Sequence, residues 1–172
     1  MQTLPDWKHL IPADFDGNSR VWVYQGSRLF GMAEALQIEG LLEDFVENWK
    51  SHGTPVKGYA NLIFGQFLVI MADETATGVS GCSTDSSVRL VKEIETLFGV
   101  NMFDRLSLAF IVNEKVQMLP LNQISYAIEN GFVKPDTIYF NNLVQTKNDL
   151  LNKWLVPVKN SWLASRFTNT IA

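Results

Sequence analysis

The sequence contains a single cysteine, Cys82, and only two histidines, His9 and His52. One cysteine cannot form an internal disulfide, and it cannot supply the several thiolates of a structural zinc site. Two histidines also leave few nitrogen ligands for a transition metal. These scarcities exclude disulfide scaffolds and multi-cysteine zinc sites and limit metal chemistry, and the sequence leaves any cofactor unknown.

Basic runs and long apolar runs are also absent. The net charge is −4 and no cluster of Lys and Arg occurs, so we expect no nucleic-acid partner, because non-specific binding to nucleic acids needs a basic surface. The longest apolar runs, such as residues 67–72, have the length of a strand rather than of a membrane span. Residues 1–15 carry charges and two prolines where a signal peptide needs an apolar stretch. We therefore expect a cytoplasmic protein with no membrane partner.

The bulk composition is that of a soluble globular protein, with 47% apolar and 19% charged residues in a chain of 172. This length suits one domain with a proper core. We expect a single domain over residues 1–172, made of an irregular N-terminal arm (1–18), an α+β core (19–131) and a C-terminal helical extension (132–172). Apolar side chains should fix the arm to the core: Trp7, Leu10, Ile11 and Phe15.

Hydrophobic periodicity sets the expected order of elements as β-α-β-β-α-β-β-α. The strands are expected at 20–24, 56–64, 67–73, 106–112 and 116–119, and the helices at 32–50, 84–98 and 121–129. The first six elements match the split β-α-β order of ferredoxin-like folds, to which one strand and one helix are added.

The C-terminal extension should hold a further helix at 147–154 and an aromatic tail. Trp154, Trp162 and Phe167 are too apolar for a free tail, so we expect the tail to dock onto the body or onto a second subunit, which would form a homodimer.

The segment Asp73 to Ser87 (DETATGVSGCSTDSS) is the strongest candidate site. It leaves an apolar strand, turns at glycines and opens a helix. Helix N-termini present free N–H groups and a partial positive charge, which favour an anion and lower the pKa of a cysteine. Arg28, a planar fork of donors after the first strand, is expected at the same end of the sheet. The candidate ligand-binding residues for a small anion are Arg28, Asp73, Ser80, Gly81, Ser83, Thr84 and Ser86.

Three chemical interpretations of this junction stay open. Cys82 can act as a nucleophile or redox thiol, although His9 and His52, the candidate bases, lie far away in sequence. The hydroxyls and amides can bind a phosphate or carboxylate, although Asp85 would already satisfy the helix end. Asp73, Glu74 and Asp85 can hold a divalent cation such as magnesium. Cys82 and Asp85 are the candidate catalytic residues.

A structural interpretation competes with these. Ser, Thr and Asp are the preferred residues of helix N-caps and first turns, and Cys82 would then be buried as a small apolar side chain. One cap needs one hydroxyl, whereas the segment offers five, and this excess favours a binding site: Ser80, Ser83, Thr84, Ser86 and Ser87.

The stretch GCSTDSSVRLVKEIE, with VWVYQGSR and FDRLSLAF on either side and VPVKNSWLASRF near the end, resembles a bacterial family of uncharacterised proteins. The resemblance spans the chain, and GCS-x-DSS is its most distinctive motif. Some members carry the automatic label "ABC transporter ATPase". Such an ATPase needs G-x-x-x-x-G-K-[ST], and none of the eleven glycines begins that pattern. The resemblance therefore implies no catalytic residues.

The sequence thus favours a ligand-binding or protein-interaction domain. The alternatives are a small enzyme acting through Cys82 or Asp85, and an accessory protein of a nucleotide-dependent transporter.

Overall fold

The computed structural model describes residues 6–168. They form a mixed α+β fold in which every strand pairing is antiparallel. The described chain divides into two compact units: a larger one of residues 6–104 with Val144–Leu151, and a smaller one of Arg105–Leu143 with residues 152–168. The boundaries expected at residues 18 and 131 do not coincide with these units. No helix within residues 6–168 is long and apolar enough to cross a membrane.

The larger unit is built on a three-stranded sheet with the order β1-β5-β4. These strands are Arg20–Gln25 (β1), Lys57–Ile63 (β4) and Phe67–Asp73 (β5). All seven residues of the central strand β5 are buried. A continuous apolar run therefore indicates the strand that has neighbours on both sides.

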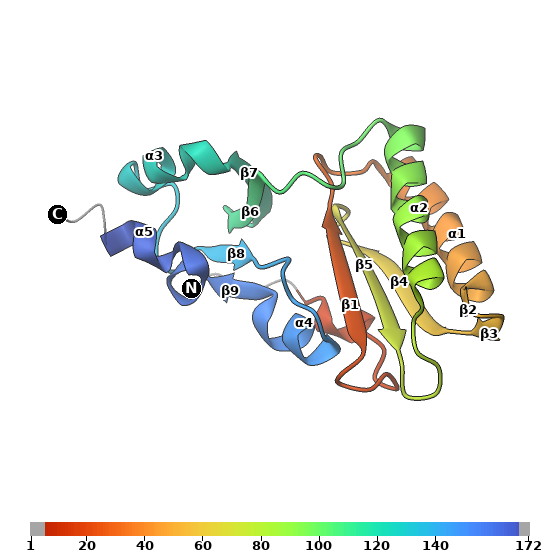
Figure 1. The fold of residues 1–172 in the computed structure, drawn as a ribbon. Helices are drawn as coiled ribbons and strands as arrows, with labels where there is room; N and C mark the ends of the chain where they lie inside the picture. Colours follow the sequence, from red (N-terminus) through yellow and green to blue (C-terminus); the bar gives the residue numbers. More distant parts are fainter. Residues whose placement is uncertain (1–5, 169–172) are drawn as a thin grey trace. The chain divides into compact units, whose positions relative to one another are not determined.

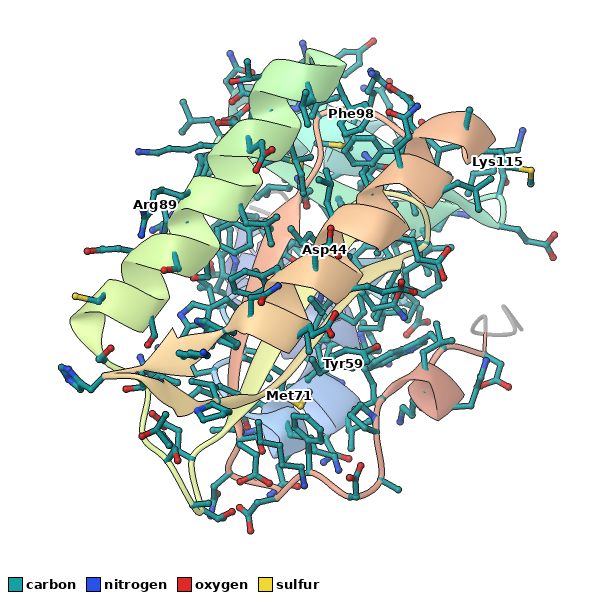
Figure 2. All side chains as sticks on the ribbon, turned by 90° about the vertical axis from the view of Figure 1, so that its right-hand side faces the viewer. Asp44, Tyr59, Met71, Arg89, Phe98 and Lys115 are labelled. Atoms are coloured by element: carbon teal, nitrogen blue, oxygen red, sulfur yellow. The ribbon has the colours of Figure 1, made fainter. Side chains whose placement is uncertain are left out.

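Two helices cover one face of this sheet: α1 (Met32–Asn48) and α2 (Gly81–Phe98). They lie side by side, as Figures 1 and 2 show. Each presents an apolar stripe to the sheet, and Gly99 ends α2 in the left-handed conformation, with φ 61°. The stripe residues that are buried in the core are Ile38 and Leu42 of α1 and Leu90, Val91 and Ile94 of α2.

A small hairpin follows α1 in the larger unit. Its strands are Lys50–Ser51 (β2) and Thr54–Pro55 (β3). The turn residues His52 and Gly53 both have positive φ, 51° and 81°, as a type I′ turn requires.

The outer edge of β1 is bordered by a segment from much later in the chain. The amide of Val21 donates to the carbonyl of Gln145 at 3.0 Å, and the amide of Lys147 donates to the carbonyl of Ser19 at 2.9 Å. The strand at 106–112, expected to complete this sheet, instead pairs with strands of the smaller unit. The order β1-β5-β4 agrees with the first five expected elements, but a complete ferredoxin-like topology is not confirmed.

The smaller unit contains a four-stranded sheet with the order β7-β6-β8-β9. Its strands are Ser107–Val112 (β6), Lys115–Pro120 (β7), Ile138–Phe140 (β8) and Leu155–Pro157 (β9). The remaining elements of the chain are α3 (Ile124–Glu129), α4 (Lys147–Lys153), α5 (Ser165–Thr168) and four 3₁₀ turns, η1 (Lys8–Leu10), η2 (Leu121–Gln123), η3 (Val158–Asn160) and η4 (Trp162–Ala164).

The C-terminal extension is therefore not wholly helical, because β8 and β9 lie within it. Its aromatic residues dock onto the smaller unit. Trp154 is fully buried, Phe167 packs against the core of that unit, and Trp162, although 49% exposed, donates to the hydroxyl of Tyr139 at 3.1 Å. The expectation that Trp154, Trp162 and Phe167 do not form a free tail is confirmed.

The N-terminal arm is fixed by three of its four predicted anchors. Trp7, Ile11 and Phe15 are buried, whereas Leu10 is 39% exposed. Phe15 packs edge-on against Tyr59 of β4, with the ring centres 6.4 Å apart.

Candidate functional site

The predicted junction begins with a capped helix. Ser80 is the N-cap residue of α2, and its Oγ accepts a hydrogen bond from the amide of Ser83 at 3.2 Å. The hydroxyl of Thr84 donates back to the carbonyl of Ser80 at 3.1 Å. The helix starts three residues before the predicted start at Thr84, because Ser80 supplies the cap.

The other hydroxyls of the junction also make internal hydrogen bonds. Ser83 and Ser87 have no exposed surface. Ser83 Oγ donates to the carbonyl of Lys50 at 2.7 Å, and the carbonyl of Ser83 accepts from the indole of Trp49 at 2.9 Å. Ser87 Oγ donates to the carbonyl of Thr84 at 2.6 Å, and Ser86 Oγ donates to the carbonyl of Cys82 at 3.0 Å.

The excess of hydroxyls therefore has a structural explanation. Ser83 ties the start of α2 to the end of α1 and to the β2–β3 hairpin, and Ser86 and Ser87 bond within the helix. The predicted ligand-binding role of Ser80, Ser83, Thr84 and Ser86 gains no support from their positions. A side chain on Gly81 would meet nothing within 4 Å, so packing does not require glycine there.

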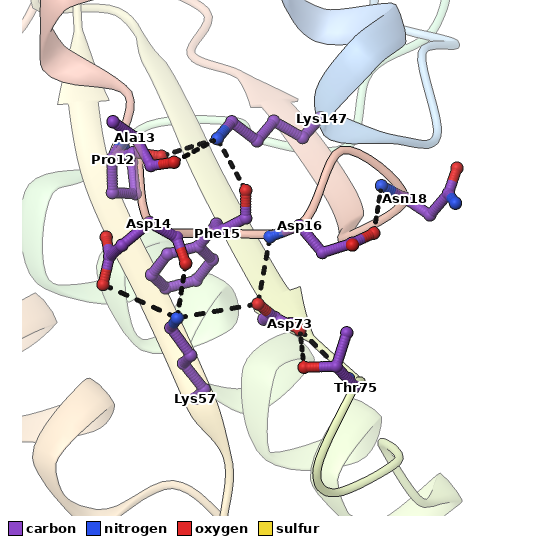
Figure 3. Close-up of polar contacts among 10 residues, drawn as sticks. All are labelled: Pro12, Ala13, Asp14, Phe15, Asp16, Asn18, Lys57, Asp73, Thr75 and Lys147. Atoms are coloured by element: carbon purple, nitrogen blue, oxygen red, sulfur yellow. Dashed lines mark hydrogen bonds and ion pairs between the residues drawn. The ribbon is translucent and has the colours of Figure 1, made fainter.

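Asp73, at the end of β5, belongs to a polar cluster that holds the N-terminal arm (Figure 3). Its Oδ2 accepts from the amide of Asp16 at 3.0 Å, and its Oδ1 accepts from the amide and the hydroxyl of Thr75 at 3.0 and 2.7 Å. Lys57 Nζ lies 3.6 Å from Oδ2. These hydrogen bonds, the one from Asp16 first, hold the pKa of Asp73 well below its usual range. Both oxygens are thus occupied by the protein itself.

Two lysines complete this cluster. Lys57 Nζ donates to the carbonyl of Asp14 at 2.6 Å and lies 4.8 Å from the ring centre of Phe15. The buried Lys147 donates to the carbonyls of Pro12 and Phe15, each at 2.7 Å, and lies 3.5 Å from a third carbonyl of the arm (Figure 3). The cluster therefore fixes residues 12–16 to β4, β5 and α4.

Arg28 does not lie at the junction, and the prediction that placed it there is wrong. β1 and β5 run antiparallel, so a residue that follows β1 lies where β5 begins, whereas the junction follows the end of β5. Arg28 makes two hydrogen bonds of 2.8 Å to the carboxylate of Glu34 and one of 2.7 Å to the carbonyl of Phe98, at the C-terminal end of α2. Hydrogen bonds from Arg28 and from the amide of Gly31 lower the pKa of Glu34 to about 2.

Glu74 has its own structural partners at the junction end of the sheet. Its Oε1 accepts from the amide of Val79 at 2.8 Å, and Arg20 lies 3.7 Å from the same oxygen. No three His, Cys, Asp or Glu side chains within residues 6–168 are grouped to hold a metal ion. The cation interpretation of Asp73, Glu74 and Asp85 therefore gains no support.

Cys82 and Asp85 are both exposed on the first turns of α2. The expectation that a structural Cys82 is buried is wrong. Neither candidate base forms a hydrogen bond with Cys82. His9 pairs with Asp6 at 3.1 Å, and His52 lies in the type I′ turn. The structure thus places Cys82 and Asp85 on an open surface and not in a pocket with Arg28.

A second surface, which the sequence analysis missed, lies between α1 and β4 on the larger unit. We call it the α1–β4 groove. It has a volume of about 320 Å³ and contains the highly exposed side chains Met32 (85%) and Leu36 (64%). Leu29, 63% exposed, borders it because its Cδ1 lies 3.1 Å from the place that a Cβ on Gly65 would take. The groove is lined by Met32, Ala35, Leu36, Glu39, Leu42, Asn61, Leu62 and Gly65.

The strand beside the groove is an open edge. β4 pairs with β5 on one side, and no described residue forms a strand on its other side. Open edges attract other strands, and proteins usually protect them with Lys, Pro, short length or a covering segment. β7 is bounded by Lys115 and Pro120, β9 is three residues long and ends at Pro157, and β1 is bordered by residues 145–147. β4 carries Lys57 at its first position, and the N-terminal arm contacts Lys57 and Tyr59, but residues 60–63 contain neither Lys nor Pro.

The groove has one acidic side chain in its lining, Glu39, and the helix that carries it is acidic. Within α1, five residues are acidic and none is basic: Glu34, Glu39, Glu43, Asp44 and Glu47. Glu34 is paired with Arg28. Glu39 and Glu43 follow Leu36 at i+3 and i+7, so they continue the stripe of α1 that faces the groove.

The composition of the groove changes along its length, because α1 and β4 run in opposite directions. The amide of Phe30 donates to the carbonyl of Gly65 at 2.9 Å, which places the start of α1 beside the end of β4. Trp49 lies against Gly58, where a Cβ would come within 2.6 Å of its ring, which places the end of α1 beside the start of β4. The groove is therefore apolar near Leu62 and Gly65, and its one charged lining residue, Glu39, lies farther along α1.

No protein-family model, curated protein or solved structure matches this chain.

Proposed function

We propose that the protein is a protein-binding module in which β4 accepts an extended segment of a partner as an added strand. The observation that carries this proposal is the open edge of β4 beside the α1–β4 groove. In strand addition, main-chain hydrogen bonds supply affinity, and pockets for alternate side chains supply specificity.

The dimensions suit this mode of binding. An added strand directs every second side chain to the same face of the sheet, at a spacing of about 7 Å. On the α1 face those side chains would lie over Met32, Leu36 and Leu62, whose exposed apolar surface would be buried. Burial of the two exposed large apolar side chains of α1, Met32 and Leu36, gives such a complex a favourable hydrophobic contribution.

An enzyme or an anion-binding function at the junction is less well supported. The hydroxyls of Ser83 and Ser87 are buried in structural hydrogen bonds, Asp73 is occupied by the arm, and Arg28 caps the far end of α2. Cys82 and Asp85 remain exposed, without a base or a cationic partner arranged around them in the described residues.

Selection of peptides from an unbiased random library, followed by amide hydrogen exchange of the ¹⁵N-labelled protein, tests the proposal. We expect the selected peptides to protect the amides of residues 57–63 most strongly. N-methylation of alternate peptide residues should abolish binding in one register and leave it unchanged in the other, because only one edge of the peptide faces β4.

A matched pair of substitutions controls this experiment. Leu36→Glu should abolish binding of the selected peptides, whereas Leu97→Glu, at a leucine of α2 that is 57% exposed, should leave it unchanged. Peptides that protect other amides, or that respond equally to both substitutions, would contradict the proposed function.

A further inference from the structure

We infer that the segment recognised on β4 is cationic, and that its groove-facing residues are apolar first and basic afterwards, read from its N-terminus. This inference rests on the proposed function and specifies the chemistry of the partner.

The charge comes from α1. Glu39, Glu43 and Glu47 are exposed, and no ion pair to a described residue satisfies them. They are spaced at i, i+4 and i+8, so their carboxylates form one stripe. Like charges at this spacing destabilise an isolated helix, and Glu43 and Glu47 also lie near the C-terminal end of α1, where the helix dipole disfavours acids. A partner with Lys or Arg at the matching positions would relieve all of these repulsions.

The order of residues follows from the polarity of the groove. All strand pairings in residues 6–168 are antiparallel, and antiparallel pairs are slightly more stable per residue than parallel ones, so we assign the antiparallel direction to the added strand. The N-terminal part of that strand then lies beside Leu62 and Gly65, at the apolar end. Its C-terminal part runs toward Gly58, along the part of α1 that carries Glu39 and Glu43.

The same charges disfavour a second copy of this chain as the occupant. A two-fold pairing of β4 with its own copy would bring both α1 helices to the same face of a continuous sheet. Glu39 and Glu43 lie near the middle of α1, so the acidic stripes would face each other, and juxtaposed like charges oppose association.

The probe is a fluorescent octapeptide, TVTLTKTK, whose alternate residues V, L, K and K share one face. Its controls are TVTLTETE, with the charge reversed, and KTKTLTVT, with the direction reversed. We expect TVTLTKTK to bind at least about tenfold more tightly than either control, and to bind several-fold more weakly at 500 mM than at 50 mM salt, because exposed charges are screened.

A charge swap on the protein gives the strongest test. Glu39→Lys combined with Glu43→Lys should weaken TVTLTKTK by about tenfold and should improve TVTLTETE, since the coupling belongs to the facing charges. Asp44→Lys is the control for Glu43→Lys: it changes the net charge equally, and Asp44 is also exposed, but helix geometry places it about 100° around the axis from Glu43. Circular dichroism and urea unfolding of each variant establish that it is folded.

The outcomes separate the inference from the proposed function. If peptides protect the β4 amides regardless of their charge, or if Asp44→Lys acts as strongly as Glu43→Lys, the cationic inference is wrong and strand addition stands. If no peptide protects these amides, strand addition itself fails. A concentration-dependent dimer that Leu36→Glu dissociates would identify a second copy as the occupant and overturn the cationic partner.

Discussion

The junction at residues 73–87 and the α1–β4 groove differ in how far the protein already satisfies their polar groups. The junction has many hydroxyls and carboxylates in its sequence, but those of Ser83, Ser87 and Asp73 form hydrogen bonds with other groups of the protein. The groove has one carboxylate in its lining, Glu39, and the backbone of β4 beside it is left without a neighbouring strand in the described residues. A polar sequence is therefore a weaker sign of a binding site than a polar group without a partner.

The comparison implies that substitutions around the junction reduce stability, whereas substitutions in the groove reduce binding. The largest effect is expected at Lys147, whose buried ammonium holds the arm next to Asp73. Lys147→Met should lower the free energy of unfolding by about 3 kcal/mol, because it leaves carbonyls of the arm without a donor. Urea unfolding followed by tryptophan fluorescence measures this change.

The control for this substitution is Lys159→Met. Lys159 is half exposed and pairs with Asp136 at 2.7 Å on the surface, so its loss should cost at most about 1 kcal/mol. Equal effects of the two substitutions would show that the arm is not held through Lys147.

The next effect is expected within the helix start itself. Ser83→Ala should lower the free energy of unfolding by about 1–3 kcal/mol, because the carbonyl of Lys50 loses its donor inside the protein. Cys82→Ala, at the neighbouring exposed position, should change it by no more than about 0.5 kcal/mol. Thermal or urea unfolding of both variants decides the point, and a Cys82→Ala variant as unstable as Ser83→Ala would contradict the structural role given to Ser83.

On the groove side, stability and binding should separate. Met32→Gln should change the free energy of unfolding by no more than about 0.5 kcal/mol, because the side chain is 85% exposed. The same substitution should weaken TVTLTKTK about fivefold, since apolar surface that the peptide would cover is lost. Fluorescence anisotropy measures the binding. A Met32→Gln variant that lost stability but bound TVTLTKTK as tightly as before would contradict the difference proposed between the groove and the junction.

The smallest effect on folding is expected at Glu34, the acidic residue of α1 that forms an ion pair with Arg28. Its pKa is lowered to about 2, first by Arg28 and then by the amide of Gly31. A lowered pKa in the folded state contributes stability above the pKa of the unfolded chain, near 4.3, and this contribution is lost as the pH falls toward 2.

Arg28→Gln should therefore raise the pKa of Glu34 and make the loss of stability between pH 5 and pH 2 less steep. Carbon-detected NMR of the Glu34 carboxyl group reports the titration directly. Part of the acid dependence should remain in this variant, because Asp73 keeps its own hydrogen bonds. A Glu34 titration that is the same in both proteins would exclude the Arg28 interaction as its main cause.

Local pattern was sufficient to predict much of the larger unit. The apolar run of β5, the stripe of α1 and the left-handed glycine that ends α2 each follow from neighbouring residues. Pairing between distant segments was not predictable in this way. The strand at 106–112 was assigned to the wrong sheet, and β8 and β9 were missed because three residues are too few to show a period.

The errors at the candidate site have the same origin. The partners of Ser83 lie more than 30 residues away, at Trp49 and Lys50, so its hydroxyl looked free in the sequence. The expected position of Arg28 was wrong because β1 and β5 are antiparallel. The end of β1 and the end of β5 therefore lie at opposite ends of the sheet. Met32, Leu36 and Glu39 recur at helical spacing outside the core stripe of α1, and this second stripe was the one available sign of the groove.

The segment at residues 144–151 borders β1 and supplies Lys147 to the arm, although the rest of the larger unit is finished by residue 104. During synthesis the edge of β1 and the arm must therefore wait until the intervening 39 residues, Arg105–Leu143, have been made. Domains of other chains fold as their N-terminal residues emerge, but this unit closes only when a late part of the chain returns to it. Synthesis of residues 144–151 thus completes both the edge of β1 and the attachment of the arm.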